Sequence, residues 1–353
     1  MITSGDENVV VANNVWKIFG DRAKEALEAI RKDNLSKAEV LEEYGAVVGV
    51  KDVSISVNKG EVFCIMGLSG SGKSTLVRHI NRLIEPTHGD ILINGVNVGN
   101  LNAEDLRAMR ADKIGMVFQN MALLPHRTVS DNIAFSLELR NIDAFTRSQA
   151  AEKVIETVSL QGYGDRYPSQ LSGGMQQRVG LARALAADPD ILLMDEPFSA
   201  LDPLIRRGLQ DEFLALSKVM KKTTLFITHD LDEAIRMGSR IAIMKDGEIV
   251  QIGTPEDIVT KPADKYVADF VAGISKLKLI FAHTIMQPIA KYEKNNGKIK
   301  DIRACPKADA EDDLDALVGH AVGQDNPVVI MSDGKPVGIV TKDALLRGVQ
   351  GET

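Results

Sequence analysis

The chain of 353 residues is 44% hydrophobic and 26% charged, which is typical of a globular protein of about two domains. Its net charge of −7 gives no indication of the basic surface that is typical of a nucleic-acid-binding protein. Two cysteines are too few for a disulfide framework, and no apolar run approaches the ~18 residues of a membrane span. We therefore expect a protein of a reducing cytoplasm that reaches a membrane only through a partner.

The N-terminal region predicts strands that are separated by two short helices. Val9–Val11 opens a strand, and apolar residues recur at helical spacing between residues 22 and 44. Ser36 followed by Glu39 is a capping-box pattern, which divides this helical stretch into two helices. Residues 47–57 then return to a strand pattern.

The most informative motif is Gly67-Leu68-Ser69-Gly70-Ser71-Gly72-Lys73-Ser74, which matches the phosphate-loop pattern G-x-x-x-x-G-K-[ST] at every specified position. It follows the apolar run Val62–Met66 and precedes a helical segment that begins with Thr75. The glycines allow successive N–H groups to turn toward a phosphate chain, and the helix N-terminus adds partial positive charge. We expect Lys73 to reach the β- and γ-phosphates and the Ser74 hydroxyl to bind Mg²⁺.

Strands and helices alternate through the rest of the first 270 residues. Asp90–Val96 contains an Asn-Gly hairpin signal, and residues 121–187 are mostly helical by period. The short apolar runs that predict further strands are 114–118, 191–194, 224–228 and 240–244. This alternation favours an α/β fold with a mostly parallel sheet that is covered on both faces.

Two acidic residues, Asp195 and Glu196, follow the apolar run 191–194. A strand end beside a phosphate loop is where a carboxylate can hold Mg²⁺ through water, a role that fits Asp195. Strand alternation points Glu196 the other way, where it can act as the general base for a water that attacks the γ-phosphate. The alternative is that Asp-Glu-Pro merely ends a strand.

A second anion site is predicted at Leu171-Ser172-Gly173-Gly174, where Ser-Gly-Gly opens a helix. Because one chain already carries a phosphate loop, a second site suggests that another subunit completes the same nucleotide site. Alone, Ser-Gly-Gly is also an ordinary helix start. Its place between a phosphate loop and an Asp-Glu strand makes the functional interpretation the stronger one.

These motifs resemble the ATPase subunit of an ABC transporter over roughly residues 8–270. The resemblance implies a nucleotide-binding domain at 1–270, with a RecA-like core and a helical subdomain at about 120–187. By composition Trp16 rivals Phe19 as the aromatic residue that stacks on adenine, but the family pattern favours Phe19. The resemblance also implies that Gln119 of the Q-loop is an Mg²⁺ ligand that senses the permease, and that His229 is the switch histidine on the γ-phosphate. It places Gln176 with Leu171–Gly174 in the site completed in trans, and it assigns Ser199 and Asp202 to the D-loop.

The helical insertion at 21–46 and the segment Asn81–Thr87 resemble the quaternary-amine importers, which take up glycine betaine, proline betaine, choline or proline. The main alternative is an importer of another small polar solute, taurine-like or an amino acid. A soluble ABC ATPase that acts on DNA or ribosomes is disfavoured, because the chain has no long coiled-coil insert and no second cassette. A small-molecule kinase is disfavoured because it does not need Leu171–Gly174.

After Phe270 the composition shifts, which predicts a linker at 271–296 and a small α+β module at 297–353. Val328–Val340 predicts a strand–turn–strand unit, and the segment that ends it resembles a CBS module. The expected Asp of that family falls on Ala344, with Asp343 one position early, which argues against adenosine binding there. A regulatory module and a vestigial dimerisation element both remain open.

The resemblance also implies how the parts work together. Two copies bind ATP head to tail, each nucleotide lying between one phosphate loop and the partner's Ser172–Gly174 segment. Hydrolysis opens the dimer and alternates the access of separate permease subunits, which receive substrate from a binding protein. The implied protein is an ATP hydrolase with Mg²⁺ as cofactor and no nucleic-acid partner, held peripherally at the cytoplasmic face of the inner membrane.

Overall fold

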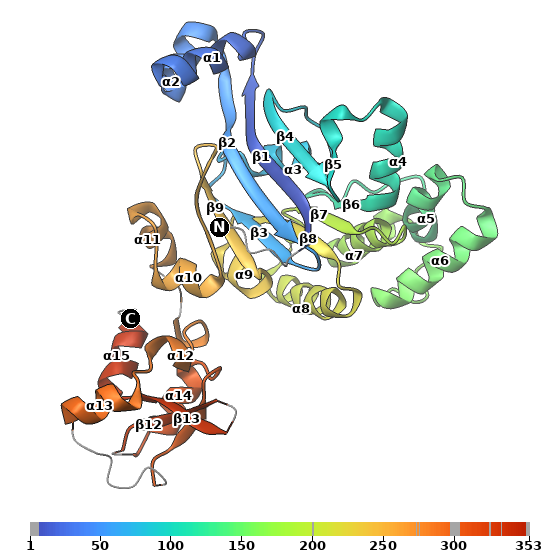
Figure 1. The fold of residues 1–353 in the computed structure, drawn as a ribbon. Helices are drawn as coiled ribbons and strands as arrows, with labels where there is room; N and C mark the ends of the chain where they lie inside the picture. The colour runs from blue at the N-terminus through green and yellow to red at the C-terminus, as the bar shows by residue number, and fades with distance from the viewer. Residues whose placement is uncertain are drawn as a thin grey trace. The chain divides into compact units, whose positions relative to one another are not determined.

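The computed structural model describes residues 7–199, 201–272, 274, 276–296, 304–324, 326–332 and 334–350. The chain divides into two compact units, Met1–Ile252 and Gly253–Thr353 (Figure 1). Each unit encloses hydrophobic cores of its own.

A four-stranded antiparallel sheet in the order β2-β1-β4-β5 forms one layer of the first unit. Its strands are β1 (Asn8–Phe19), β2 (Val47–Asn58), β4 (His88–Ile93) and β5 (Val96–Asn97). Asn94 and Gly95 make the predicted hairpin turn, with φ of 48° and 78°. The two predicted helices, α1 (Ala23–Asp33) and α2 (Lys37–Tyr44), join β1 to β2, and Ser36 caps α2 in a complete capping box.

A six-stranded sheet in the order β10-β9-β3-β8-β7-β6 forms the second layer. The pairs within β9-β3-β8-β7-β6 are parallel. Its strands are β3 (Val62–Met66), β6 (Ile114–Val117), β7 (Ile191–Asp195), β8 (Thr223–Thr228), β9 (Arg240–Lys245) and β10 (Glu248–Gly253). Every residue of β3, β7 and β8 is buried, as a parallel strand covered on both faces requires. The α/β prediction is confirmed.

Helix α3 (Lys73–Ile80) lies between the two sheets, because Leu76, Val77 and Ile80 share one core with residues of β1, β2, β3 and β8. A separate core holds α5 (Val129–Leu139), α6 (Ala144–Thr157) and α7 (Gly173–Leu185) together as the expected helical subdomain. Figure 1 shows α5 and α6 on the β6 side of this unit. The remaining helices are α4 (Ala103–Lys113), α8 (Pro203–Met220) and α9 (Leu231–Met237), with 3₁₀ turns η1 (Val98–Asn100) and η2 (Pro168–Gln170).

The second unit is an α+β module around a three-stranded sheet in the order β11-β12-β13. β11 pairs with β12 in parallel and β12 with β13 antiparallel, so the predicted strand–turn–strand unit is present. Its elements are α10 (Pro255–Thr260), α11 (Lys265–Val271), η3 (Lys276–Lys278), α12 (Ala282–Ile285), α13 (Ile289–Asn296), β11 (Lys307–Asp309), α14 (Leu314–Ala321), β12 (Val328–Ser332), β13 (Lys335–Val340) and α15 (Lys342–Gln350).

The second unit begins earlier than the expected boundaries at residues 270 and 297. Ile280 and Ala282 are fully buried in the core that also holds Val328 and Ile330, so much of 271–296 is structured rather than a linker. The reason is that the few apolar residues of this segment, although they stand among polar ones, can pack against the three-stranded sheet and become buried there. Composition read along the chain does not reveal that burial.

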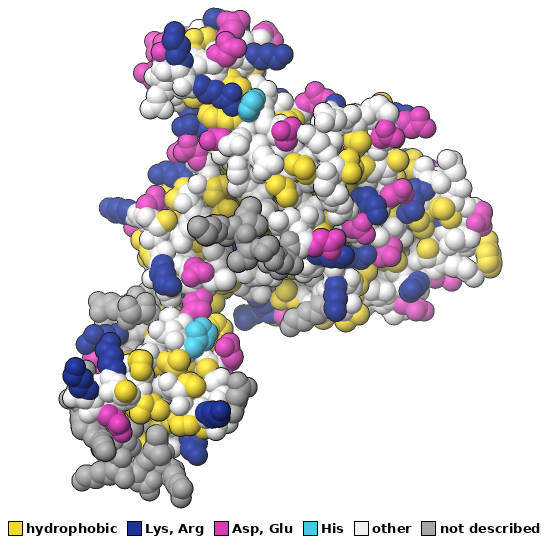
Figure 2. Space-filling model, in the orientation of Figure 1, with side chains coloured by type: hydrophobic (Ala, Val, Ile, Leu, Met, Phe, Trp, Pro, Cys, Tyr) yellow, Lys and Arg dark blue, Asp and Glu magenta, His cyan; other side chains and the backbone are white. Residues whose placement is uncertain are grey.

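On the face of the first unit in Figure 2, basic and acidic side chains are interspersed. None of the helices in the described part of the chain combines the length and the hydrophobicity that crossing a bilayer demands.

Candidate functional site

The phosphate loop joins the end of β3 to the first residue of α3, as its motif predicts. Gly67 has φ of 154°, and a Cβ there would lie 2.2 Å from the Met244 carbonyl oxygen. Gly72 has φ of 102°, and its Cβ would lie 2.3 Å from the Gly49 carbonyl oxygen. Only glycine fits at these two positions, because backbone atoms cannot move aside as a flexible side chain does.

The side chain of Lys73 folds back along the loop that precedes it. Its Nζ donates hydrogen bonds to the carbonyl oxygens of Gly67 at 2.8 Å and Leu68 at 3.0 Å. Burial lowers the pKa of Lys73, while the carboxylates of Glu196 and Asp195 oppose that shift. The ammonium therefore sits between the loop and two acids, where an anionic phosphate chain gives it a stronger partner than backbone carbonyls.

The Ser71 hydroxyl oxygen is buried and has no hydrogen-bond partner among the described residues. A buried hydroxyl without a partner costs free energy, so such groups usually serve a ligand or water. Its place inside the phosphate loop fits the binding of an anion there.

Asp195, the last residue of β7, points at the start of α3. It is only 3% exposed, and its Oδ1 accepts a hydrogen bond from Ser74 Oγ at 2.8 Å. Its Oδ2 lies 3.3 Å from Nη2 of Arg78. The carboxylate is thus held beside the hydroxyl that was expected to bind Mg²⁺.

Glu196 leaves the strand, which differs from the alternation expected for it. Its φ of 47° is left-handed, so the side chain does not take the direction that a continuing strand sets. Its Oε2 lies 3.0 Å from Nδ1 of His229 and 3.4 Å from Nε2 of Gln119. Three residues predicted from separate motifs therefore meet at one carboxylate oxygen.

These groups surround a single cleft of about 610 Å³. It lies at the carboxyl ends of β3, β8, β7 and β6, four neighbouring strands, which is where open parallel sheets bind ligands. The residues that line the cleft are Gly49, Leu68, Ser69, Gly70, Gly72, Lys73, Ser74, Thr75, Gln119, Glu196 and His229.

The oxygen donors of the cleft suit Mg²⁺. The ion takes one or two protein ligands and completes its shell with phosphate oxygens and water. Ser74, Gln119 and Asp195 offer a hydroxyl, an amide oxygen and a carboxylate around the phosphate loop. Among the described residues no group of three or more His, Cys, Asp and Glu is placed to hold a metal ion.

The residues expected to act in trans lie outside this cleft. Ser172 and Gly173 are exposed, and Ser172 Oγ caps α7 by accepting a hydrogen bond from the Met175 N–H at 3.4 Å. Leu171 is buried in the helical core, whereas Gly174 and Gln176 are partly buried. None of the five lines the cleft of its own chain.

The two D-loop residues, Ser199 and Asp202, have different surroundings. Ser199 Oγ donates a hydrogen bond to the backbone oxygen of Glu196 at 3.0 Å, and Asp202 is exposed just before α8. Ser199 thus steadies the turn that carries Glu196, while Asp202 remains available at the surface.

The two candidate aromatic residues for adenine stacking differ in how deeply they are buried. Trp16 is 6% exposed and belongs to the core under α1 and α2, whereas Phe19 is 40% exposed at the end of β1. The ring of Phe19 lies against Gly49, where a Cβ would come within 2.7 Å of it. Sequence reasoning missed Gly49, because a lone glycine in a strand has no motif; its position opposite an exposed aromatic is visible only in three dimensions.

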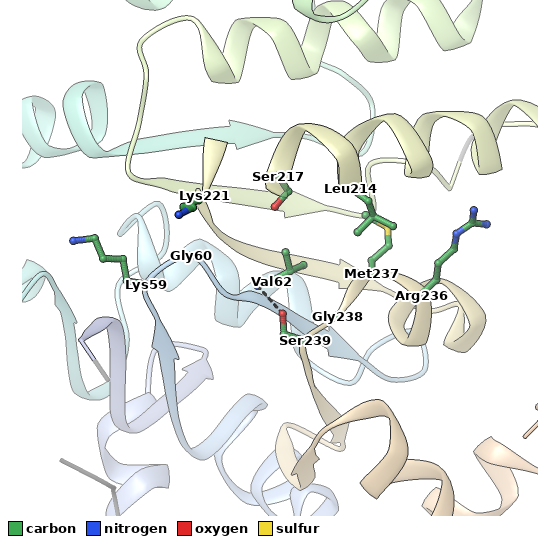
Figure 3. A pocket seen from close by; sticks show the side chains of 10 residues that line it. All are labelled: Lys59, Gly60, Val62, Leu214, Ser217, Lys221, Arg236, Met237, Gly238 and Ser239. Atoms are coloured by element: carbon green, nitrogen blue, oxygen red, sulfur yellow. Dashed lines mark hydrogen bonds between the residues drawn. The ribbon is translucent and has the colours of Figure 1, made fainter. Parts of the chain in front are cut away.

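A different pocket of about 660 Å³ lies at the opposite end of the large sheet (Figure 3). Val62, the first residue of β3, lines it, whereas the phosphate loop follows the last residue of that strand. Figure 3 shows Lys59 and Lys221 at one side and Arg236 at the other. None of the predicted site residues lines it, so it is separate from the nucleotide cleft.

A phosphate loop packed against carboxylates at the ends of parallel strands defines the first unit as a P-loop nucleotide hydrolase. The family model for "ABC transporter" matches residues 50–199. The chain is 52% identical over 286 residues to the glycine betaine/proline betaine transport system ATP-binding protein ProV of Salmonella typhimurium, covering 80% of this chain and 71% of that protein. The chain therefore belongs to the ABC transporter family, as one of its ATP-hydrolysing proteins.

Further similarities agree with this assignment. The chain is 53% identical over 274 residues to the trimethylamine N-oxide transport system ATP-binding protein TmoW of Ruegeria pomeroyi, covering 78% of this chain and 80% of that protein. A solved dimeric, post-hydrolysis structure of the ATP-binding cassette MJ0796 with ADP and Pi matches with a TM-score of 0.59 at 32% identity. That match covers 70% of this chain and 98% of the cassette.

Proposed function

We propose that this chain is the ATP-hydrolysing subunit of an ABC importer for a quaternary-amine osmoprotectant. The observation that carries the proposal is the convergence of Gln119, Glu196 and His229 on one oxygen beside the phosphate loop. That arrangement offers a base for water and two polar groups around the γ-phosphate position.

Each group in the cleft takes a defined part in hydrolysis. Lys73 and the loop N–H groups hold the phosphates, and Phe19 stacks on adenine. Ser74, Gln119 and, through water, Asp195 would hold Mg²⁺, which would neutralise charge on the phosphates. Glu196 accepts the proton of the water whose oxygen bonds to the γ-phosphorus as the bond to ADP breaks, and His229 holds the γ-phosphate.

The proposed active form is a head-to-tail dimer of two copies. Ser172 and Gly173 are exposed and lie outside the cleft of their own chain, which leaves them available to a partner's nucleotide. With Leu171, Gly174 and Gln176 they present a helix N-terminus to the γ-phosphate. ATP contacts both copies and favours the closed dimer, and hydrolysis removes that advantage.

A groove beside Gln119 is the proposed docking site for the permease. It has a volume of about 580 Å³ and lies between β6 and helices α4, α5 and α7. Phe118, Leu124, Phe135 and Leu139 give it an apolar lining, with Arg183 among the polar residues. Leu139 is 66% exposed, as an anchor for a partner helix must be.

The substrate assignment comes from the relatives, since the ATPase does not touch the solute. Glycine betaine, proline betaine, choline and proline are the proposed solutes, delivered by a binding protein to the permease. This subunit then sits peripherally at the cytoplasmic membrane face. The second unit is proposed as a CBS-like module, with regulation and dimerisation as its two candidate roles.

ATPase activity of this subunit, reconstituted with its permease and binding protein, tests the proposal. Glycine betaine, choline, proline, trimethylamine N-oxide and taurine are titrated at low and at high salt. Stimulation by glycine betaine, choline or proline supports the substrate class, whereas stimulation only by taurine or by an amino acid other than proline supports the alternative importer. A rate that depends on salt supports a regulatory second unit, and salt independence supports a dimerisation element.

Permease docking has its own test. Leu139→Lys places a charge in the apolar groove and is expected to abolish the stimulation by solute while leaving the basal ATPase rate unchanged. Phe145→Lys is the matched control, because Phe145 is 72% exposed on α6 and does not line the groove. Equal stimulation in both variants would contradict the proposed docking site.

A further inference from the structure

The turn between β9 and β10, which belongs to none of the nucleotide-binding motifs, is hydrogen-bonded to the phosphate loop. Asp246 and Gly247 connect β9 to β10. The N–H of Gly247 donates a hydrogen bond to the Ser71 carbonyl oxygen at 3.0 Å, and the Gly247 carbonyl oxygen accepts one from the Lys51 N–H at 2.8 Å. One residue therefore bridges the phosphate loop and β2.

The bond to Ser71 sets the direction of a ligand-facing donor. A peptide unit is planar and trans, so the carbonyl of Ser71 and the N–H of Gly72 point in opposite directions. When Gly247 holds the Ser71 carbonyl on its own side, the Gly72 N–H is directed away from the turn. Gly72 lines the nucleotide cleft and stands at the N-cap of α3.

The phosphate loop packs closely against the backbone of β2, of β9 and of the turn at Gly247. A Cβ at Gly247 would lie 3.0 Å from the Gly49 carbonyl oxygen, and one at Gly72 would lie 2.3 Å from the same atom. A Cβ at Gly67 would lie 2.2 Å from the Met244 carbonyl oxygen in β9. The loop thus rests directly on the backbone of β2 and β9.

Charged side chains fix the turn on its other side. Lys51 forms an ion pair with Glu248 at 2.5 Å. Burial lowers the pKa of Lys37, the first residue of α2, and the carboxylates of Asp246 and Glu248 oppose that shift, so its ammonium lies within their field. A Cβ at Gly247 would lie 3.4 Å from Nζ of Lys37, so the start of α2 lies beside the same turn that contacts the phosphate loop.

We propose that Gly247 is a positioning residue for nucleotide binding, because it orients the Ser71–Gly72 peptide unit of the phosphate loop. The inference rests on the proposed nucleotide site. It assigns to the β9–β10 turn a role that no phosphate-loop motif contains.

Gly247→Ala tests the proposal against a matched control, Gly95→Ala. Both glycines end two-residue hairpin turns, with φ of 82° at Gly247 and 78° at Gly95, after residues with φ of 50° and 48°. A Cβ at Gly95 meets nothing within 4 Å. The backbone strain of alanine is therefore shared, and only Gly247→Ala adds contact with Gly49 and a disturbed bond to Ser71.

The readouts are the Kd for Mg·ATP by calorimetry and the thermal unfolding of each variant. We expect both variants to lose stability, Gly247→Ala more because of its contact with Gly49, and only Gly247→Ala to weaken ATP binding, by about tenfold, as loss of one oriented donor implies. If wild-type protein does not bind Mg·ATP, the proposed function fails. If it binds and the two variants share the same Kd, the positioning role fails.

A measurement on the wild-type protein covers the case in which Gly247→Ala does not fold. Mg·ATP is expected to slow amide hydrogen exchange in a peptide that spans Lys245–Gly253, because an ordered loop strengthens the bond between Gly247 and Ser71. Exchange across the β4–β5 turn at Gly95 is expected to stay constant. Unchanged exchange in the Lys245–Gly253 peptide would overturn the proposal.

Discussion

Replacing Glu196 by Gln is the sharpest test of the hydrolytic site. The two side chains have nearly the same shape, and Gln tolerates the left-handed φ of 47° no worse than Glu. The change therefore removes a negative charge and a proton acceptor while leaving the phosphate loop untouched. We expect ATP to bind and hydrolysis to stop, so that the ATP-bound dimer accumulates.

The size of the effect follows from the geometry. Oε2 of Glu196 lies 3.0 Å from His229 Nδ1 and 3.4 Å from Gln119 Nε2, and the side chain is 17% exposed, so bulk water does not readily replace it as a base. A positioned general base contributes roughly 10²- to 10⁴-fold in rate, which corresponds to about 2.7–5.5 kcal/mol of activation free energy. Removing the carboxylate also removes repulsion with the γ-phosphate, so the affinity for ATP is expected to stay equal or rise.

The assay combines steady-state phosphate release at saturating Mg·ATP with molar mass by light scattering. The Glu196→Gln variant is expected to run with ATP at twice the 38.4 kDa mass of the chain. Glu85→Gln is the matched control, because this carboxylate is 70% exposed and pairs only with Arg82 among the ion pairs of the described residues. A monomeric Glu196→Gln protein that hydrolyses ATP at more than about one tenth of the wild-type rate would refute the assignment of the base.

Three further changes probe other parts of the chain. Lys73→Ala removes the ammonium beside the phosphate loop and is expected to abolish hydrolysis; retained phosphate release would mean that the loop does not bind phosphates as described. Burial lowers the pKa of His79, whose Nδ1 lies 2.6 Å from the Ile84 carbonyl oxygen. As the pH drops below about 6.5, His79 therefore takes up a proton in the unfolded state before it does so in the folded state, and the free energy of unfolding falls. Urea unfolding between pH 5 and 8 is expected to show this slope, and His79→Gln to flatten it; an equal slope in both proteins would contradict it. Ser36→Ala breaks the capping box with Glu39 and is expected to cost about 1 kcal/mol in urea unfolding without changing the ATPase rate, and an altered rate would show that α2 acts on the site directly.

The sequence alone identified the features that are local in the chain. The phosphate loop is readable because its strand, its glycines and Lys73 are contiguous, and their backbone geometry follows from glycine and helix physics. The α2 capping box was equally readable, because Ser36 and Glu39 satisfy each other within one turn. By contrast α4 has no buried residue and so gives no apolar period, although Asn102 at its N-cap marks its start.

Only the tertiary structure decided how distant residues combine. Gln119, Glu196 and His229 meet because parallel pairing of β6, β7 and β8 brings three strand ends to one edge of the sheet. The family pattern favours Phe19 over Trp16, but only the structure shows Trp16 buried and Phe19 exposed. The close contacts of Gly49 and Gly247 likewise involve backbone atoms that approach across more than 20 residues of chain. Sequence patterns record what neighbours in the chain do to each other, whereas close packing between segments is settled only when the sheets and α3 are assembled.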